Sequence, residues 1–313
     1  MTVVPLTQRW PTRVIPRPAL PARLRRVEWQ RQFTRPVLVG ATALGILLWL
    51  QYILMFPIAI DGHAYFAADS VRLYTRPEGA PDAYFYSPVF AQVLAPLQSF
   101  GWDVFRTVWR LAELAALTAF VGPFIGLALF IGPLAGEVNL ANIHLLLAAA
   151  MVAGFRWPAA WSFVLLTKIT PGIGLLWFAV RREWRSLGIA LGATALIASV
   201  SLVLAPGLWV DWIRALSSAK PPVGETVVLN VPLGLRVLAG AALVAWGARR
   251  DQRWTVIVAG FIALPLTWLY ATSMLAAIPL AILSGRRRGT DPLGLAWNSP
   301  RATPGTAGLV LAP

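Results

Sequence analysis

Long apolar runs constrain this chain more than any other feature of its sequence. Several of them approach or exceed the roughly 20 residues that cross a bilayer as a helix, and one extends over residues 157–180. The chain is 58% hydrophobic and 13% charged, whereas soluble domains average about 45–50% and about 25%. We therefore predict an all-α polytopic membrane protein with about eight to ten transmembrane helices, including broken or re-entrant ones.

The basic residues divide the chain into three parts. Residues 1–35 are rich in arginine and proline, and we predict a disordered cytoplasmic arm that contacts anionic lipid. Residues 36–284 carry the apolar runs and form one transmembrane domain. Residues 285–313 are rich in Pro, Gly and Thr and predict a disordered cytoplasmic tail.

Arginines in the short segments between apolar runs set the predicted topology. Arg106 and Arg110 follow a predicted span over residues 85–100, and we expect them at the inner face. Both termini are likewise expected inside. These topological roles explain the net charge of +14 without a nucleic-acid partner.

The residue types that are missing exclude several chemistries. The chain has no cysteine and two histidines, which excludes disulfides, cysteine nucleophiles and histidine-rich metal sites. We expect neither a metal ion nor a cofactor.

Asp61 follows the first apolar run and lies in an acidic segment, residues 57–83, that we place outside. With helical spacing, Asp61 shares one face with Tyr65, Asp69 and Arg72. This pattern predicts a short helix at the outer surface with a polar face toward a cavity, and Asp61 as a catalytic base. Alternatively, Asp61 caps the helix and Asp69 pairs with Arg72.

Further polar residues lie among apolar neighbours. Tyr86 opens the second predicted span, either facing substrate or as an interfacial anchor. Glu137 and His144 are seven residues apart, so we expect them on one helical face, and ionisable groups inside a membrane are functional candidates. Alternatively, Asn139 caps a helix and Asn142 bonds to a neighbouring one.

Lys168 interrupts the apolar run over 157–180 between Arg156 and Arg181. Positive charge at both ends predicts a broken hairpin that reaches mid-membrane and returns, and a single full span is the alternative. A buried ammonium needs an anion, either a carboxylate or a lipid phosphate. Arg236 is a second candidate for phosphate, unless it only extends its charged end to the interface.

Taken in order, these segments resemble the pattern of glycosyltransferase family 87, within the GT-C superfamily of integral-membrane transferases. The resemblance covers roughly residues 37–284. Glu137 departs from it, because the family tends to show Gln there. The matching stretches are Asp61-Gly62-His63-Ala64-Tyr65, Tyr86-Ser87-Pro88-Val89-Phe90, Leu94-Ala95-Pro96-Leu97, Gly136-Glu137-Val138-Asn139, Lys168-Ile169-Thr170-Pro171, Arg181-Arg182-Glu183-Trp184-Arg185 and Leu264-Pro265-Leu266-Thr267-Trp268.

The resemblance implies a GT-C fold and an inverting, metal-independent transferase. Such an enzyme passes a sugar, typically mannose, from a polyprenyl-phosphate donor to the hydroxyl of a glycolipid or glycan acceptor. We expect it in a bacterial inner membrane, with its active site on the extracytoplasmic side and with Asp61 as the general base. We expect the donor phosphate to contact Lys168, Arg236 and Arg72, and the substrates to contact Tyr65, Asp69, Tyr86, Glu137, Asn139 and His144.

Two other functions fit the sequence. A carrier or flippase for lipid-linked saccharides also uses broken helices with charged residues at mid-membrane. The acids gather on an outer loop instead of deep in several spans, which favours the transferase. A non-catalytic assembly subunit is the third possibility.

Overall fold

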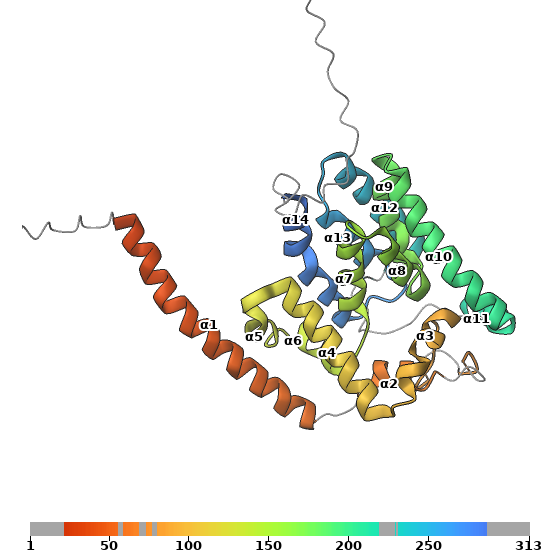
Figure 1. Cartoon of the computed structure of the whole chain (residues 1–313), viewed down its shortest axis with the longest axis horizontal. Coiled ribbons are helices and arrows are strands. Elements are labelled where there is room, and N and C mark those ends of the chain that lie inside the picture. The colour runs from red at the N-terminus through yellow and green to blue at the C-terminus, as the bar shows by residue number, and fades with distance from the viewer. Residues whose placement is uncertain are drawn as a thin grey trace, which may run out of the picture.

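The structure of the chain is a computed structural model that describes residues 22–55, 59–68, 73–76, 80–218, 229 and 231–286. Within these ranges it consists of helices joined by turns, with no strand (Figure 1). The predicted all-α class is confirmed. Helix α1 (Ala22–Met55) already begins inside the predicted basic arm, and the division into arm, transmembrane domain and tail stays a prediction.

Three described helical segments are long and apolar enough to cross a bilayer. They lie in α1, in α4 (Trp102–Val121) continued by η1 (Gly122–Phe124) and α5 (Ile125–Ala128), and in α10 (Trp184–Leu204). A fourth candidate is the pair α6 (Gly132–Leu140) and α7 (His144–Gly154), which bends by 99° at the break. The polytopic membrane class is thus confirmed, and the count of eight to ten spans stays a prediction.

The second predicted span is much shorter than expected. Helix α3 (Pro88–Gln98) has 11 residues, which at about 1.5 Å per residue covers about half of the hydrocarbon thickness. The ring of His63 in α2 (Ile60–Phe66) lies 4.9 Å from that of Trp102, at the start of α4. Arg106 therefore lies at the same end as α2, and the prediction that it marks the opposite face was wrong.

Residues 157–180 form a hairpin. The chain enters through η2 (Pro158–Ala160) and α8 (Trp161–Thr167) and returns through η3 (Thr170–Leu175) and α9 (Leu176–Val180). Lys168 has an extended backbone between α8 and η3, and Pro171, which has no N–H to donate, occupies the first turn of η3. The Trp161 and Phe178 rings meet edge to face at 6.5 Å. These contacts across the two arms favour the predicted hairpin over a single span.

A second broken hairpin follows helix α12 (Leu233–Arg249). It descends through α13 (Trp254–Ile262) and returns through η4 (Leu269–Ala277) and α14 (Ile278–Arg286). Arg253, just before α13, donates to the Ser284 carbonyl at 2.9 Å, which joins the two ends of this hairpin. The Arg253 guanidinium also lies 5.0 Å from the Phe155 ring at the base of the first hairpin. Both hairpins therefore open at the same end of the molecule.

The tips of both hairpins reach the bend between α6 and α7. Lys168 approaches His144. A Cβ placed on Gly136 would lie 2.2 Å from the ring of Tyr270, in η4. The polar centre of the molecule is therefore built where two interrupted hairpins and one bent helix pair converge.

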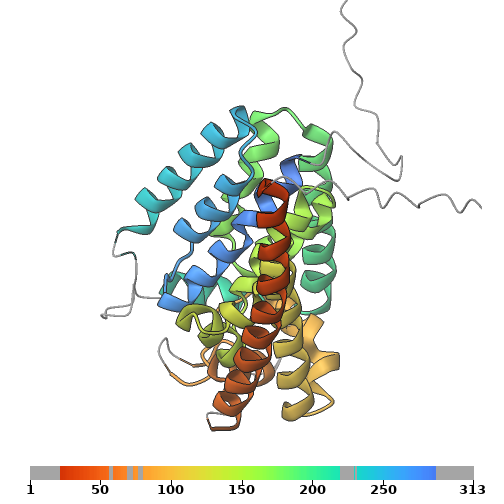
Figure 2. The same ribbon diagram turned by 90° about the vertical axis from the view of Figure 1, so that its left-hand side faces the viewer.

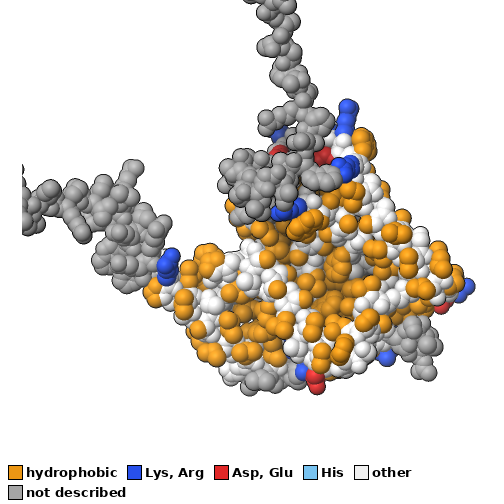
Figure 3. All heavy atoms as spheres, viewed as in Figure 1, with side chains coloured by type: hydrophobic (Ala, Val, Ile, Leu, Met, Phe, Trp, Pro, Cys, Tyr) orange, Lys and Arg blue, Asp and Glu red, His pale blue; other side chains and the backbone are white. Residues whose placement is uncertain are grey.

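Long helices flank this centre. In Figure 1 α1 lies to one side of the body and its N-terminal part projects away from it, while α10 runs along the opposite side to meet α11 (Pro206–Ser218). Figure 2 shows α1 in front of the body. Large apolar side chains of α10 are exposed, for example Val203 at 81%, which is expected of a surface that faces lipid. In Figure 3 hydrophobic side chains cover most of the visible body, and much of the blue of Lys and Arg lies at its ends.

Candidate functional site

Helix α2 carries Asp61 and packs closely against the bend between α6 and α7. Ala141, in the bend, has a left-handed backbone with φ 54°. A Cβ added to Gly62 would lie 2.7 Å from the Cβ of Ala141, a distance that side chains do not tolerate. The glycine after Asp61 thus allows the close approach of α2 to the bend.

The bend presents Asn142 to Asp61. The side-chain oxygen of Asn142 accepts a hydrogen bond from the backbone N–H of Ile143 at 2.8 Å, which fixes the orientation of the amide. Its Nδ2 therefore donates to the carboxylate Oδ2 of Asp61 at 2.8 Å. The alternative role of Asp61 as a helix cap was wrong, because α2 starts after Ala59 without a side-chain cap.

Two tyrosines extend this hydrogen-bonded chain. The Tyr65 hydroxyl donates to the Asn142 side-chain oxygen at 3.2 Å and lies 3.0 Å from the Tyr86 hydroxyl. Tyr65 is buried, whereas Tyr86 is partly exposed. Both predicted substrate contacts therefore lie beside Asp61, and their contact with substrate stays a prediction.

Aromatic packing holds these hydrogen-bonded side chains in place. The Tyr65 ring lies 5.4 Å from Phe90 and 5.3 Å from Trp109, distances usual for packed rings. The Trp109 indole N–H donates to the Asn142 backbone carbonyl at 2.7 Å. Helices α3 and α4 thereby fix both α2 and the bend.

Glu137, His144 and Lys168 form the other half of the site. The Glu137 carboxylate accepts the His144 backbone N–H at 2.6 Å, and both its oxygens lie 3.1 Å from His144 Nδ1. His144 Nε2 lies 2.9 Å from Lys168 Nζ. The expectation that Glu137 and His144 share a helical face was wrong, since the helix breaks at Ala141. The break itself brings them together.

Electrostatics couples the two halves. Burial raises the pKa of Asp61 to about 6, and the Glu137 carboxylate adds to the rise. The charge of Lys168 and the hydrogen bond from Asn142 act in the opposite direction. Asp61 is thus close enough to Lys168 for the ammonium to favour the ionised carboxylate.

Arg236 bonds to the second hairpin. Its guanidinium donates to the carbonyls of Val231, Leu264 and Pro265 at 2.8, 2.8 and 3.1 Å, and to that of Ile262 at 3.4 Å. Ile262 is the last residue of α13, where a helix leaves carbonyls unpaired. Leu264 and Pro265 lie in the break that follows. Arg236 therefore stabilises the break, and its predicted contact with phosphate stays untested.

Of the remaining predicted residues, one contacts Arg110 and two fall outside the described residues. Asn139 accepts from Arg110 through its backbone oxygen at 2.7 Å and its side-chain oxygen at 3.3 Å. It lies inside α6 instead of capping a helix. Asp69 and Arg72 fall outside the described residues, and their roles stay predictions.

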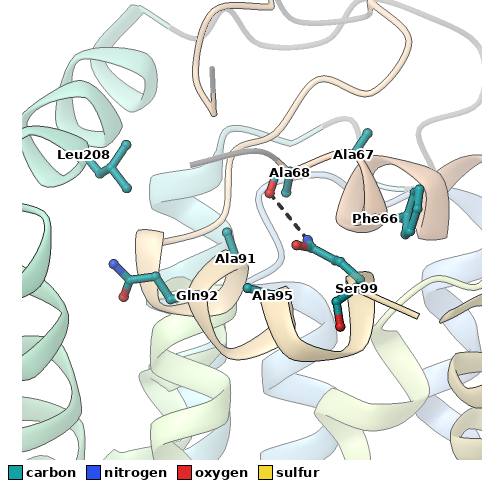
Figure 4. Close-up of a pocket in the computed structure, with 9 residues that line it drawn as sticks. Phe66, Ala67, Ala68, Ala91, Gln92, Ala95, Ser99 and Leu208 are labelled. Carbon is teal, nitrogen blue, oxygen red and sulfur yellow. Dashed lines mark hydrogen bonds between the residues drawn. The ribbon is translucent and has the colours of Figure 1, made fainter. Parts of the chain in front are cut away.

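A hollow of about 670 Å³ opens between the end of α2 and helix α3 (Figure 4). Ala91 and Ala95 leave room there, and Gln92 and Gln98 supply amides. Gln98 donates to the Tyr65 carbonyl at 2.8 Å and thereby ties α3 to α2. Neither Asp61 nor Lys168 lines this hollow, so we do not assign it to the site.

Asn142 is the site residue that the sequence interpretation missed. It was expected only to bond a neighbouring helix, but it joins Asp61 to Tyr65 across 81 and 77 positions of the chain. The available signal was an amide between Glu137 and His144 in an otherwise apolar stretch.

Comparison with known proteins identifies a family. The model of Glycosyltransferase family 87 matches residues 84–299, about two thirds of the chain. This interval contains Glu137, His144 and Lys168, whereas Asp61 lies before it. No curated protein and no solved structure matches the chain. The match over most of its length shows that the chain belongs to glycosyltransferase family 87.

Proposed function

We propose that this membrane glycosyltransferase moves a sugar, which we take to be mannose, from a polyprenyl-phosphate donor to the hydroxyl of a glycolipid or glycan acceptor. The observation that supports the proposal most is the meeting of Asp61 and Lys168 at the bend between α6 and α7. One supplies a carboxylate of raised pKa, and the other supplies a positive charge for a lipid phosphate.

In the proposed reaction, Asp61 accepts the proton of the acceptor hydroxyl. The acceptor oxygen forms a bond to the anomeric carbon from the face opposite the phosphate, which inverts the configuration. The bond between that carbon and the phosphate oxygen breaks, and the phosphate keeps the electron pair. General-base assistance is worth about 10²–10⁴-fold.

The leaving phosphate gains negative charge as it departs. We assign the contact with that phosphate to the Lys168 ammonium, whose residue is partly exposed. Fixed positive charge at such a position lowers the barrier. The leaving group needs no proton, so a single carboxylate is sufficient and no metal ion is part of the proposal.

The proposed orientation places this site on the extracytoplasmic side of a bacterial inner membrane. Helices α2, α3 and α11 share one end of the molecule, since Trp212 of α11 donates to the carbonyl of Phe85 at 3.0 Å. The ends of the two hairpins with Arg181 and Arg253 would then face the cytoplasm, as the excess of positive charge on the inner side requires.

The test is transfer by the purified protein in detergent. It would receive radiolabelled polyprenyl-phosphate mannose and a panel of glycolipid and polysaccharide acceptors. The proposal predicts labelled product without any membrane gradient. A carrier would leave the donor intact under these conditions, and so would a non-catalytic subunit.

A further inference from the structure

Glu137, His144 and Lys168 come from three separate elements. Glu137 belongs to α6, His144 is the first residue of α7, and Lys168 lies at the break of the first hairpin. Their side chains nevertheless form one connected row, from carboxylate through imidazole to ammonium.

One set of charges gives the hydrogen bonds in this row a single direction. With Glu137 ionised, its carboxylate only accepts, so His144 Nδ1 carries the proton that the two groups share. His144 Nε2 then has a free electron pair, to which the Lys168 ammonium donates one of its three N–H groups. The imidazole is neutral in this arrangement.

Accessibility separates the three residues. Glu137 is 0% exposed and His144 1% exposed, while Lys168 keeps part of its surface accessible. Of the three residues only Lys168 is partly exposed, so the proposed function places the lipid phosphate at its side chain and not at the other two. Because they are buried, Glu137 and His144 influence a bound phosphate only through Lys168.

We infer that Glu137 and His144 are positioning residues that hold the Lys168 ammonium toward the donor phosphate. A lysine side chain has four rotatable bonds and does not by itself hold a fixed position. His144 restrains its nitrogen at 2.9 Å, and the Tyr86 ring adds a second restraint at 5.8 Å. The remaining N–H groups of the ammonium are left for the ligand. The inference rests on the proposed function.

Glu137→Gln tests this arrangement with almost no change of shape. It introduces the residue that the family tends to show at this position, so the expected loss is specific to the row of Glu137, His144 and Lys168 in this chain. The amide can still accept the His144 backbone N–H through its oxygen, but its NH₂ group would face Nδ1. The imidazole proton then moves to Nε2, where it points at the ammonium. We expect the affinity for polyprenyl phosphate to fall about 10–100-fold, as for the loss of a hydrogen bond to a charged group.

The readout is binding of polyprenyl monophosphate to the purified full chain, measured by titration calorimetry in detergent. Transfer assays on the same variants would show a raised KM for the donor and an unchanged KM for the acceptor. Glu113→Gln is the matched control. Glu113 is also 0% exposed, and its oxygens have no hydrogen-bond partner among the described residues. Its substitution should leave phosphate affinity within about twofold.

Two further variants separate positioning from folding. In a Lys168→Met background, Glu137→Gln should cause no additional loss of phosphate affinity. His144→Gln keeps an oxygen acceptor for the ammonium and should bind phosphate more tightly than His144→Leu.

Equal phosphate affinity of the wild type and Glu137→Gln would overturn this inference but not the proposed function. So would a further loss of affinity from Glu137→Gln in the Lys168→Met background. A wild-type protein that binds no polyprenyl phosphate would overturn the proposed function together with it.

Discussion

The carboxylate of Asp61 is held by an amide whose own orientation is fixed by the backbone. Asn142 donates to Asp61 at 2.8 Å and accepts from Ile143 at 2.8 Å. A base that is already oriented needs little further ordering to reach the transition state, and this ordering is a large part of the rate enhancement by an active site.

The pH dependence of transfer should follow the raised pKa of Asp61. Burial favours the protonated acid and lifts this pKa from 3.8 to about 6, and a base must be ionised to accept a proton. We therefore expect kcat/KM for the acceptor to level off above about pH 7 and to fall about tenfold per unit well below pH 6. An acidic limb centred near pH 4 would contradict the assignment.

Lys168→Met provides a check on the acidic side of this pH profile. The ammonium lowers the pKa of Asp61, so its loss should move the midpoint of the residual activity to higher pH. Arg214→Gln, on the exposed surface of α11, should leave the midpoint unchanged.

Arg236→Met should destabilise the protein. The substitution removes hydrogen bonds to carbonyls at and after the end of α13, and each buried acceptor left unpaired costs about 1–3 kcal/mol. We expect a clear fall in the melting temperature of the detergent-solubilised protein. Arg249→Met is the control, because Arg249 lies at the exposed end of α12, the helix that also carries Arg236. A weakened affinity for polyprenyl phosphate at unchanged stability would instead support the phosphate role.

These side chains differ in how far their roles could be predicted from the sequence. Asp61 and Lys168 could be selected because a charge beside or inside an apolar run is costly. Arg236 could also be selected, but its partners could not be predicted, because Leu264 and Pro265 become neighbours only after α13 and α12 pack together. The role of Asn142 likewise depends on a contact between distant segments.

At the level of helices, too, the sequence predicted some features and not others. Prolines and Lys168 inside the run over 157–180 predicted a break, and the arginines at both ends predicted the hairpin. The length of α3 was not predicted, because an apolar composition does not distinguish a lipid-facing span from a short helix buried against α4. The contact of α2 with the start of α4 corrected the topology at that point.

The close contact between α1 and α5 should depend on two glycines. A Cβ on Gly45 would lie 2.3 Å from the Gly126 carbonyl oxygen, and one on Gly126 would lie 2.0 Å from the Cα of Thr42. Small residues allow helices in membranes to approach this closely. Gly126→Leu should therefore separate α1 from α5.

Disulfide crosslinking can measure this separation, because the chain has no cysteine of its own. A cysteine pair placed across the contact between α1 and α5 should crosslink in an otherwise unchanged protein and fail to do so with Gly126→Leu. Gly192→Leu, on α10, is the control, since a Cβ there meets nothing within 4 Å. Crosslinking that survives Gly126→Leu would show that the glycines are not required.

The whole molecule has two chemically different ends. Arg181 pairs with Glu183 and Asp251 and donates to the Ala248 carbonyl where the hairpins open. Basic residues exceed acidic ones at this end, which also carries Arg182, Arg185, Arg249, Arg250 and Arg253. Helices α2, α3 and α11 form the other end. The sequence predicted this polarity from its arginines, but the convergence of the two hairpin tips on α6 and α7 required the structure.

Single cysteines can test the proposed orientation. Asp103→Cys, at an exposed position beside α2, should react with a membrane-impermeant maleimide added outside intact cells. Arg250→Cys, at the opposite end of the molecule, should react only after the membrane is opened. The reverse pattern would place the candidate site on the cytoplasmic side.

Turnover of Asp61→Asn tests the account most directly. The amide retains the size of the carboxylate but cannot accept the acceptor proton. Transfer from polyprenyl-phosphate mannose should therefore fall about 10²–10⁴-fold, while binding of polyprenyl phosphate stays close to that of the wild type. Full turnover by the purified Asp61→Asn protein would contradict the assignment of Asp61 as the base.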